Sequence, residues 1–336
     1  MLVSWLENDS RHYDRSWFFI SWHREDRMDR INAAVVSDPH VFLIGRPPIT
    51  ELLGFIRNMA VDGQNVDLGS LTAEWRTAND HVLILEKNEA GVADNPPITA
   101  LPEPLLQLSR VVLEDAVFKR AYRFVPADIA LIDLNQLVVF QKFINLSYVE
   151  TLKGRLGPTP SPEDIFRFAL PLQPEQPQFQ IMQNAQNMYT MISTSTDFRF
   201  LESELVQPQN VSSFVSTGRP VALLALAIGY GSNFLNVIHV ENRLVLANGS
   251  HRAYALRELG ITQIPCLVQR VTRRDELELV GSADLASSPD RYLKSPRPPM
   301  LRDYFDPQLR KIVPVYRKNR VIRIQYAIEQ SDIPAQ

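Results

Sequence analysis

The chain contains a single cysteine, Cys266, among its 336 residues. One thiol excludes an intramolecular disulfide and cannot build a cysteine-rich zinc site, so a reducing cytoplasm is the expected compartment. An excess of charge of one sign is also missing, because 35 basic and 38 acidic residues leave a net charge of −3. This balance argues against a protein that coats nucleic acid over its whole surface.

Long apolar runs are absent as well. The longest, 221–228, has the length of a strand rather than of a membrane span. The first 15 residues lack a basic stretch followed by an apolar one, so no secretory signal is expected. The six histidines show no spacing typical of a metal site, and we assign no metal ligands. Hydrophobic residues nevertheless make up 45% of the chain, which is enough for a core in one large or two ordinary domains.

The most informative stretch is 244–268, LVLANGSHRAYALRELGITQIPCLV. An apolar run at 244–246 predicts a buried strand, and Asn248-Gly249 ends it. Ser250 is a good N-cap for a helix over 253–259, which Gly260 ends, and 264–268 returns to strand character. A glycine turn that leads into a helix start is suited to anions, because the first amides are free and the helix dipole favours negative charge. We expect Arg252 to contact the anion, although a surface salt bridge is the alternative for Arg252, and a structural role is the alternative for His251.

This stretch resembles the ParB/sulfiredoxin superfamily. The resemblance is carried by a Gly-x-His-Arg turn, an Ala-x-Ala-Leu helix, a Leu-Gly stop and an Ile-Pro-led strand: Gly249, His251, Arg252, Ala253, Ala255, Leu256, Leu259, Gly260, Ile264 and Pro265. It implies that the turn binds nucleotide phosphates through Asn248, Gly249, Ser250, His251 and Arg252. The nucleotide would be ATP, ADP or CTP, and it would bring Mg²⁺.

A second, less specific part of the resemblance is 129–150, whose first residues are similar to the opening strand and polar loop of ParB-type domains. The segments 219–228 and 235–240 are expected to be the strands just before the turn. The implied fold class is α/β (α+β), with a mixed sheet and flanking helices over 126–285 and an insertion near 158–206. Residues 1–125 form a mixed α/β region of unknown role, and 286–336 form a basic, proline-rich tail.

The departures from the family decide which activity to expect. Sulfiredoxins carry a reactive cysteine where this chain has Ser250, so their sulfur chemistry is not expected. The residues after Arg270 are too few and too proline-broken for the DNA reader of partition proteins. The turn is closer to that of free-serine kinases, which need a carboxylate to activate the acceptor. Asp133 and Glu150, with His251, are the predicted catalytic residues of a nucleotide hydrolase or phosphotransferase.

The second hypothesis is a non-catalytic scaffold with a degenerate nucleotide site. Its protein contacts would come from the N-terminal region, which holds all four tryptophans, or from the Pro/Gln stretch at 171–180. The segment 291–323 has ten basic residues against two acids, but its prolines favour wrapping over the protein more than binding nucleic acid. No membrane contact is expected.

The remaining expectations concern local structure. Strands are predicted at 18–22, 41–44, 82–85 and 321–328, and helices at 50–59 and 105–120. Capping boxes are predicted at Ser4 with Glu7 and at Ser147 with Glu150, the latter starting a helix over 148–155 that Gly157 ends. A further helix starts at Ser161-Pro162, and the Pro/Gln stretch after it is predicted to be an exposed loop without regular structure. In the helix after the glycine turn, Ala253, Leu256 and Leu259 should face the core, and Arg257 and Glu258 should face solvent.

Overall fold

The turn at Gly249 ends a strand of a six-stranded mixed sheet in the computed structural model, which describes residues 36–173, 176–211 and 215–334. The order is β2–β3–β12–β10–β11–β4. The bounds are β2 Ile98–Thr99, β3 Ala127–Asp133, β4 Val138–Val139, β10 Asn236–Val240, β11 Arg243–Asn248 and β12 Gln263–Val271. β10 runs parallel to β12 and antiparallel to β11, so the expected mixed α/β fold is confirmed.

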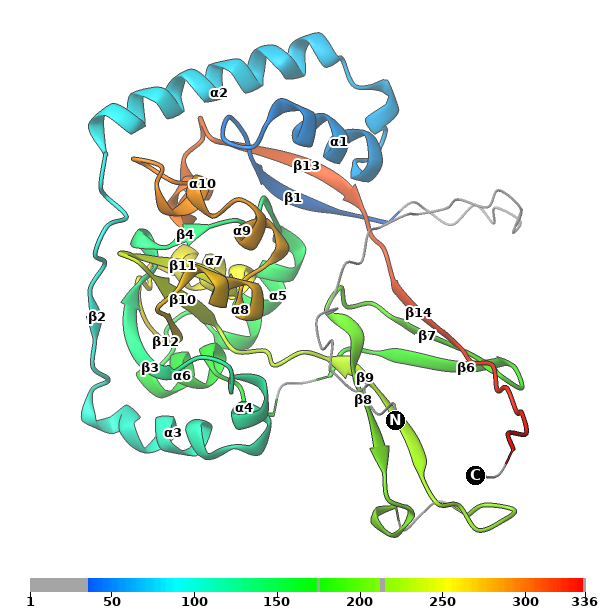
Figure 1. Cartoon of the computed structure of the whole chain (residues 1–336). Coiled ribbons are helices and arrows are strands. Elements are labelled where there is room, and N and C mark those ends of the chain that lie inside the picture. The colour runs from blue at the N-terminus through cyan, green and yellow to red at the C-terminus, as the bar shows by residue number, and fades with distance from the viewer. Residues whose placement is uncertain (1–35, 174–175, 212–214, 335–336) are drawn as a thin grey trace, which may run out of the picture. The chain divides into compact units, whose positions relative to one another are not determined.

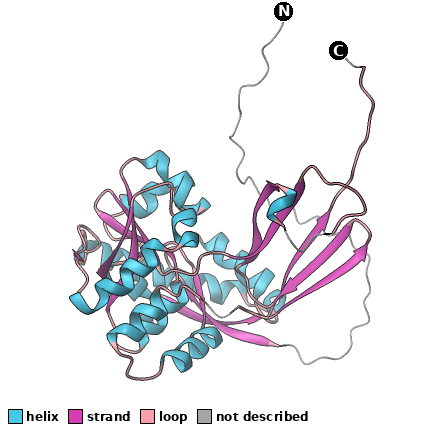
Figure 2. Cartoon of the chain, turned by 90° about the horizontal axis from the view of Figure 1, so that it is seen from below, coloured by secondary structure: helices cyan, strands magenta, loops and turns pink. Residues whose placement is uncertain are grey.

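Helices pack against this sheet because their apolar positions repeat with helical spacing. They are α3 Glu103–Glu114, α4 Ala116–Ala121, α5 Leu146–Leu156, α6 Pro162–Ala169, α7 Ser250–Glu258, α8 Leu277–Val280, α9 Ala283–Ser287 and α10 Pro289–Leu293, with 3-10 turns η2 Leu134–Gln136, η4 Arg274–Glu276 and η5 Leu301–Phe305. Figure 2 shows helices gathered around this part of the chain. Ala253 and Leu256 are fully buried, whereas Leu259 is only partly buried. The expected core face of α7 is therefore confirmed at its first two positions.

A second sheet joins three parts of the sequence that lie far apart. Its order is β13–β1–β5, with β1 Ser37–Leu43, β5 Phe143–Asn145 and β13 Arg310–Tyr316. Helix α1 Ile49–Met59, the turn η1 Gly63–Asn65 and helix α2 Leu68–Asn88 follow β1 (Figure 1). The strand expected at 41–44 and the helix at 50–59 are confirmed. Residues from the regions predicted as 1–125, 126–285 and 286–336 thus share one sheet, within the compact unit Val36–Gln336.

Two further sheets are built mainly from the insertion. One has the order β14–β7–β6, with β6 Phe179–Ala185, β7 Met188–Ser193 and β14 Arg320–Gln325. The other is a ribbon of β8 Phe198–Val206 and β9 Leu223–Tyr230, joined through η3 Pro208–Asn210. Figure 1 shows these strands in green to yellow, apart from β14, which is red.

Several local predictions need correction. Residues 82–85 lie in α2 rather than in a strand, because Leu71, Ala78 and Val82 bury one helical face while Leu83 and Ile84 are exposed. The helix expected over 105–120 breaks at Asp115, whose extended backbone and side chain cap a new helix at the Phe118 amide.

Helix starts explain two more differences. Asn145, not Ser147, caps α5, and Glu150 faces solvent beside Lys153, so the capping box predicted there is wrong. Ser250 is not the N-cap of α7 either, because the left-handed Gly249 takes that position. The helix start at Ser161-Pro162 is confirmed, and the structure adds a capping box there between Ser161 and Asp164; Gly157 ends α5 as predicted.

The strand predictions differ from the structure mainly in where each strand pairs. Within 219–228 a strand does form, but it pairs with β8 in the ribbon instead of joining the main sheet. Part of the Pro/Gln stretch, expected to lack regular structure, enters β6 at Phe179. The strand at 321–328 is shorter, ending at Gln325, and pairs with β7. The predictions at 18–22 and at Ser4 lie outside the described residues.

Ion pairs, with the buried Arg297 among them, connect the tail to α2 and to Glu89, the residue that follows it. Arg297, only 2% exposed, donates to Glu89 at 3.0 Å and to both carboxylate oxygens of Asp303. Arg302 donates to the same Glu89. At the other end of α2, Lys311 pairs with Glu74. Much of the positive charge in the tail is therefore matched by acids of the N-terminal region, in line with a tail that wraps over the protein.

Candidate functional site

The turn between β11 and α7 needs glycine for two reasons. Gly249 has φ of +90°, in the left-handed region, and a Cβ there would lie 3.0 Å from the Cα atom of Leu235. Asn248 fixes the turn from both sides, because its Oδ1 accepts from the Gly249 amide at 2.8 Å and its Nδ2 donates to the Ser232 carbonyl at 3.1 Å. The backbone is thus held in one conformation as it enters the helix.

The first amides of α7 are the free donors of the site. The earliest intrahelical bond runs from the Ala253 amide to the Gly249 carbonyl at 2.9 Å. Among the described residues, no hydrogen bond gives an acceptor to the amides of Ser250, His251 or Arg252. Three amides at a helix start, with the dipole behind them, form a place where an anionic group is stabilised.

The guanidinium of Arg252 does not belong to this group of donors. It is 5% exposed and donates to the carbonyls of Phe168 and Ala169, at 3.1 and 2.9 Å, and to Oδ1 of Asn233 at 2.9 Å. Both carbonyls belong to the last residues of α6, so the cation caps the negative end of that helix. Burial lowers the pKa of Arg252 to about 10. Its hydrogen bonds go to backbone carbonyls and a side-chain amide oxygen, so the surface salt bridge considered for Arg252 does not form among the described residues.

The imidazole of His251 is neutral and structural. Its Nε2 accepts the amide hydrogen of Asn145 at 3.0 Å, which places the ring proton on Nδ1. The ring also meets Tyr148 edge-on, with centroids 5.4 Å apart. Burial, followed by the neighbouring charges of His40 and Arg252, lowers the pKa of His251 to about 4. His251 therefore joins the starts of α5 and α7 and brings no positive charge at neutral pH.

The start of α5 already holds an anion of the protein itself. The Asp38 carboxylate on β1 is bound by Arg317 through two bonds, of 2.9 and 2.6 Å. The hydrogen bond from Arg317 is the largest cause that lowers the pKa of Asp38, with further bonds from Ser147 and Asn145, against the opposing effect of burial. The positive end of α5 is thus neutralised by the Asp38 carboxylate, whereas among the described residues no carboxylate accepts from the first amides of α7.

The two predicted catalytic carboxylates lie at the wrong end of α7. Glu150 pairs with Lys153, which also bridges to Glu258 at 2.7 Å. Asp133 accepts from the amide of Asn135, whose side chain accepts from Arg257 at 2.8 Å. Positions 257 and 258 are about 10 Å along the helix from Ser250, at 1.5 Å per residue. The structure therefore brings together Asn248 to Arg252 and leaves Asp133 and Glu150 apart from them.

The same contacts correct the expected exposure of α7. Glu258 is exposed as predicted, but Arg257 is half-buried, with its guanidinium 4.0 Å from the centre of the Phe305 ring. A cation over an aromatic face keeps its charge while it covers apolar surface, which accounts for the difference.

Sequence reasoning missed the residues that approach the turn from other segments. Asp197 accepts from the Gly231 amide at 3.0 Å, next to the Ser232 carbonyl that Asn248 contacts. It is a carboxylate near the turn, and 45% of its side chain is exposed. For Tyr148 the sequence predicts only a position in a helix, and not its contact with His251. No spacing links any of these positions to the turn, because the insertion separates them.

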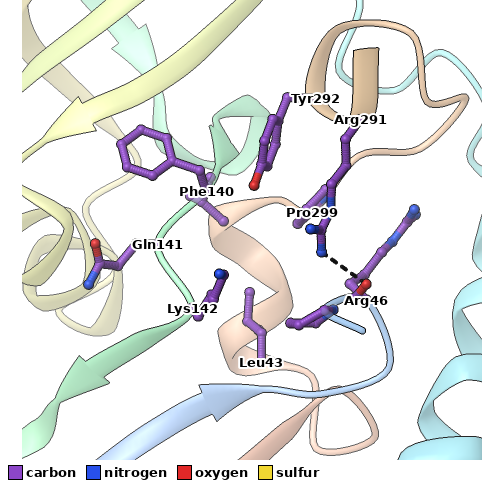
Figure 3. A pocket seen from close by; sticks show the side chains of 10 residues that line it. Leu43, Arg46, Phe140, Gln141, Lys142, Arg291, Tyr292 and Pro299 are labelled. Atoms are coloured by element: carbon purple, nitrogen blue, oxygen red, sulfur yellow. Dashed lines mark hydrogen bonds between the residues drawn. The ribbon is translucent and has the colours of Figure 1, made fainter. Parts of the chain in front are cut away.

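The pocket in Figure 3 lies away from the turn, between β1, the segment after β4 and the tail, and its lining includes Lys142, Arg291 and Tyr292. Its volume of about 10 Å³ is near the least that can hold one water molecule. Arg291 donates to the Arg46 carbonyl, the dashed bond in Figure 3, and Lys142 pairs with Glu51 at 2.6 Å. An open hollow of about 260 Å³ lies at the ends of α5 and α6, between Arg155 and Arg167.

No group of three or more His, Cys, Asp or Glu side chains in 36–173, 176–211 and 215–334 could hold a metal ion. In the same segments no helix combines the length and the apolar character that a membrane span requires. Cys266 is fully buried in β12, and burial raises its pKa, so it is an inert core thiol.

Comparisons of the chain with protein-family models, curated proteins and solved structures found no match.

Proposed function

We propose that this protein binds the phosphates of a nucleotide at the start of α7, in the manner its resemblance to the ParB/sulfiredoxin superfamily implies. The observation that carries the proposal is the set of three amides, of Ser250, His251 and Arg252, that have no acceptor among the described residues. They follow a glycine turn with the family's Gly-x-His-Arg pattern. The ligand would be ATP, ADP or CTP, accompanied by Mg²⁺.

The amides and the Ser250 hydroxyl are the ligand groups in this proposal. The side chains of Arg252 and His251 support the turn instead of contacting the phosphate. Arg252 holds α6 against the turn, and His251 joins α7 to α5. This division assigns the phosphate contact to the backbone and the stability of the site to the two side chains. Binding without phosphoryl transfer is the form we favour, because Asp133 and Glu150 lie about 10 Å along α7 from the turn.

Hydrolysis or phosphoryl transfer is the second form, and one observation supports it. Asp197 is a partly exposed carboxylate that accepts from the Gly231 amide, and the neighbouring Ser232 carbonyl accepts from Asn248 of the turn. A carboxylate can orient an attacking water or accept the proton of a hydroxyl acceptor. Release of inorganic phosphate that Asp197→Asn abolishes, while nucleotide affinity stays within about twofold, would select this form.

The test of the proposed function is titration calorimetry with Mg²⁺ and ATP, ADP, CTP or GTP, on the wild type and on Ser250→Asp. A carboxylate in the first turn favours the helix by about 0.3–1 kcal/mol but repels phosphate, so the variant should fold and lose binding. Ser282→Asp is the matched control, because Ser282 caps α9 and Asp is an equally good cap.

We expect a wild-type dissociation constant below 1 mM for at least one nucleotide, at least a tenfold loss in Ser250→Asp, and no loss in Ser282→Asp. Absence of binding by the wild type at millimolar nucleotide, or full affinity in Ser250→Asp, would contradict the proposal. The degenerate scaffold would then be the better account of the same contacts.

A further inference from the structure

The ribbon of β8 and β9 has one apolar face that the described residues leave open. Because partners across the ladder share a face, the register places Phe198, Phe200, Ser203 and Leu205 of β8 with Leu224, Leu226, Ile228 and Tyr230 of β9. The opposite face carries the charges, on Arg199, Glu202 and Glu204. At the tip, Leu205 is 72% and Leu224 68% exposed, whereas Phe198 at the base is buried.

The base of the ribbon is anchored, so the exposed tip is not a frayed end of the fold. Phe198 and Tyr230 pack with ring centroids 5.4 Å apart, and the Tyr230 hydroxyl bonds to Ser193 of β7 and to the Pro177 carbonyl. Arg120 of α4 pairs with Glu202 on the charged face. A two-stranded ribbon is marginal in water by itself, so these contacts hold its backbone in place, while among the described residues no further strand pairs with its outer edges.

The open edges of the two sheets built mainly from the insertion differ in how they are protected. Proteins usually block free edges with charges, prolines or bulges, because an open ladder pairs with other chains. Strand β8 is protected by a bulge at Phe200/Glu202 and by the charges of its glutamates, and β6 is protected by a bulge at Gln183/Ala185. Strand β14 is protected by the charges of Arg320 and Arg323. Within these two sheets β9 is the edge with no charge, no proline and no bulge of its own, over LLALAIGY.

The sequence of β9 also allows the strand to pair with a second copy of itself. Around Leu226 it is nearly palindromic, since Ala225 and Ala227 flank it and Leu224 and Ile228 follow on either side. Antiparallel pairing of two copies about a two-fold axis at Leu226 sets Leu224 opposite Ile228 and Ala225 opposite Ala227. Leu224, Leu226 and Ile228 of both copies then lie on one face, whereas the other face sets Ala225 opposite Ala227 and Leu223 opposite Gly229, and no charges are opposed.

We propose that two copies of this chain associate through antiparallel pairing of β9 with β9, in register at Leu226, to form a continuous sheet β8–β9–β9–β8. The partner is a second copy because β9 offers no charge for recognising a charged peptide, whereas its own sequence matches the ladder on both sides of the axis. The apolar faces of the two ribbons become one surface, and the charged faces stay together on the other side. This association is independent of nucleotide binding at α7.

The sharpest test uses the symmetry of the axis. A cysteine at position 226 would meet its own copy at a Cα separation of about 4.5–5.5 Å, within disulfide reach. Leu226→Cys should therefore give a covalent dimer of the full chain under mild oxidation. Ser203→Cys is the matched control, because Ser203 is the direct partner of Leu226 within the ribbon and lies one strand away from the axis. The native Cys266 is fully buried and gives little background.

Charged substitutions at the axis test the same pairing through the oligomeric state of the protein. By light scattering coupled to size exclusion at about 100 μM chain, we expect the wild type to be a dimer. Leu226→Lys and Leu226→Glu each place like charges opposite each other and should weaken the dimer at least tenfold, while an equimolar mixture of the two restores it. Ser203→Lys adds the same charge on the same face and should leave the dimer intact.

Each outcome is decisive. A monomeric wild type, a dimer that Leu226→Lys leaves unchanged, or equal crosslinking of Leu226→Cys and Ser203→Cys would overturn the proposal. Because the nucleotide titration is made on the same variants, loss of dimerisation with unchanged nucleotide affinity separates a failure here from a failure of the proposed function.

Discussion

Replacing Arg252 distinguishes a structural cation from a ligand contact. Arg252→Met keeps most of the side-chain volume and removes three hydrogen bonds, to Phe168, Ala169 and Asn233. The Ala169 carbonyl keeps a second donor, the Leu235 amide at 2.7 Å, but no other donor among the described residues would replace the bond lost to the Phe168 carbonyl. A hydrogen bond to a charged group contributes about 1.5–3 kcal/mol, and a buried acceptor left unpaired costs about 1–3 kcal/mol. We expect the free energy of unfolding to fall by about 3 kcal/mol.

The assay is urea unfolding followed by circular dichroism, with the slope m compared between variants so that a change of midpoint reports stability. Arg252→Lys should recover part of the loss, because lysine keeps the charge without the planar fork. Arg257→Met, on the same helix but half-buried with one hydrogen bond to Asn135, is the control and should lose about 1 kcal/mol. If Arg252→Met unfolds within about 0.5 kcal/mol of wild type while nucleotide affinity falls tenfold, the cation serves the ligand and the reasoning is refuted.

Two further predictions concern the same turn. The pKa of His251 is about 4 in the folded chain against 6.5 for an ordinary histidine. As the pH falls, the unfolded state therefore takes up this proton before the folded state does. Acidification from pH 7 to pH 5 should lower the free energy of unfolding by about 2 kcal/mol through this group. His251→Gln should show a shallower pH dependence in urea unfolding, and identical pH profiles would contradict the burial of a neutral ring. Gly249→Ala should destabilise the chain by about 2 kcal/mol, because of its left-handed φ and the contact with Leu235. Gly154→Ala, at an exposed position in the last turn of α5, should instead stabilise it by about 0.5–1 kcal/mol in the same assay, and a stabilising Gly249→Ala would contradict the turn geometry.

The sequence predicted the elements around the turn because their signals are local. An apolar run, a glycine and an alanine-rich helix stand next to one another in 244–260, and β11 and α7 follow that order. The helix start at Ser161-Pro162 was predicted for the same reason, since its signals lie within four residues.

Errors arose where long-range packing decides. The residues at 82–85 have strand-like side chains, but helix α2 needs only one of every three or four of them to be buried. Arg252 has the residue type and position of a phosphate ligand, yet its direction is set by α6, which the insertion brings from 83 residues away. The same holds for Asp133 and Glu150, which were predicted from their positions near the opening strand and helix of the resemblance, whereas their contacts in the structure lead to residues in the last turn of α7.

The most direct test of the central claim is a nuclear magnetic resonance titration of the isotope-labelled chain with Mg²⁺ and nucleotide. We predict that the amide signals of Ser250, His251 and Arg252 shift most, because their hydrogens meet the phosphate, and that the amides of Asp133 and Glu150 stay in place. A titration in which these three amides do not move, or in which the largest shifts lie at the Asp133 end of α7, would contradict phosphate binding at this turn.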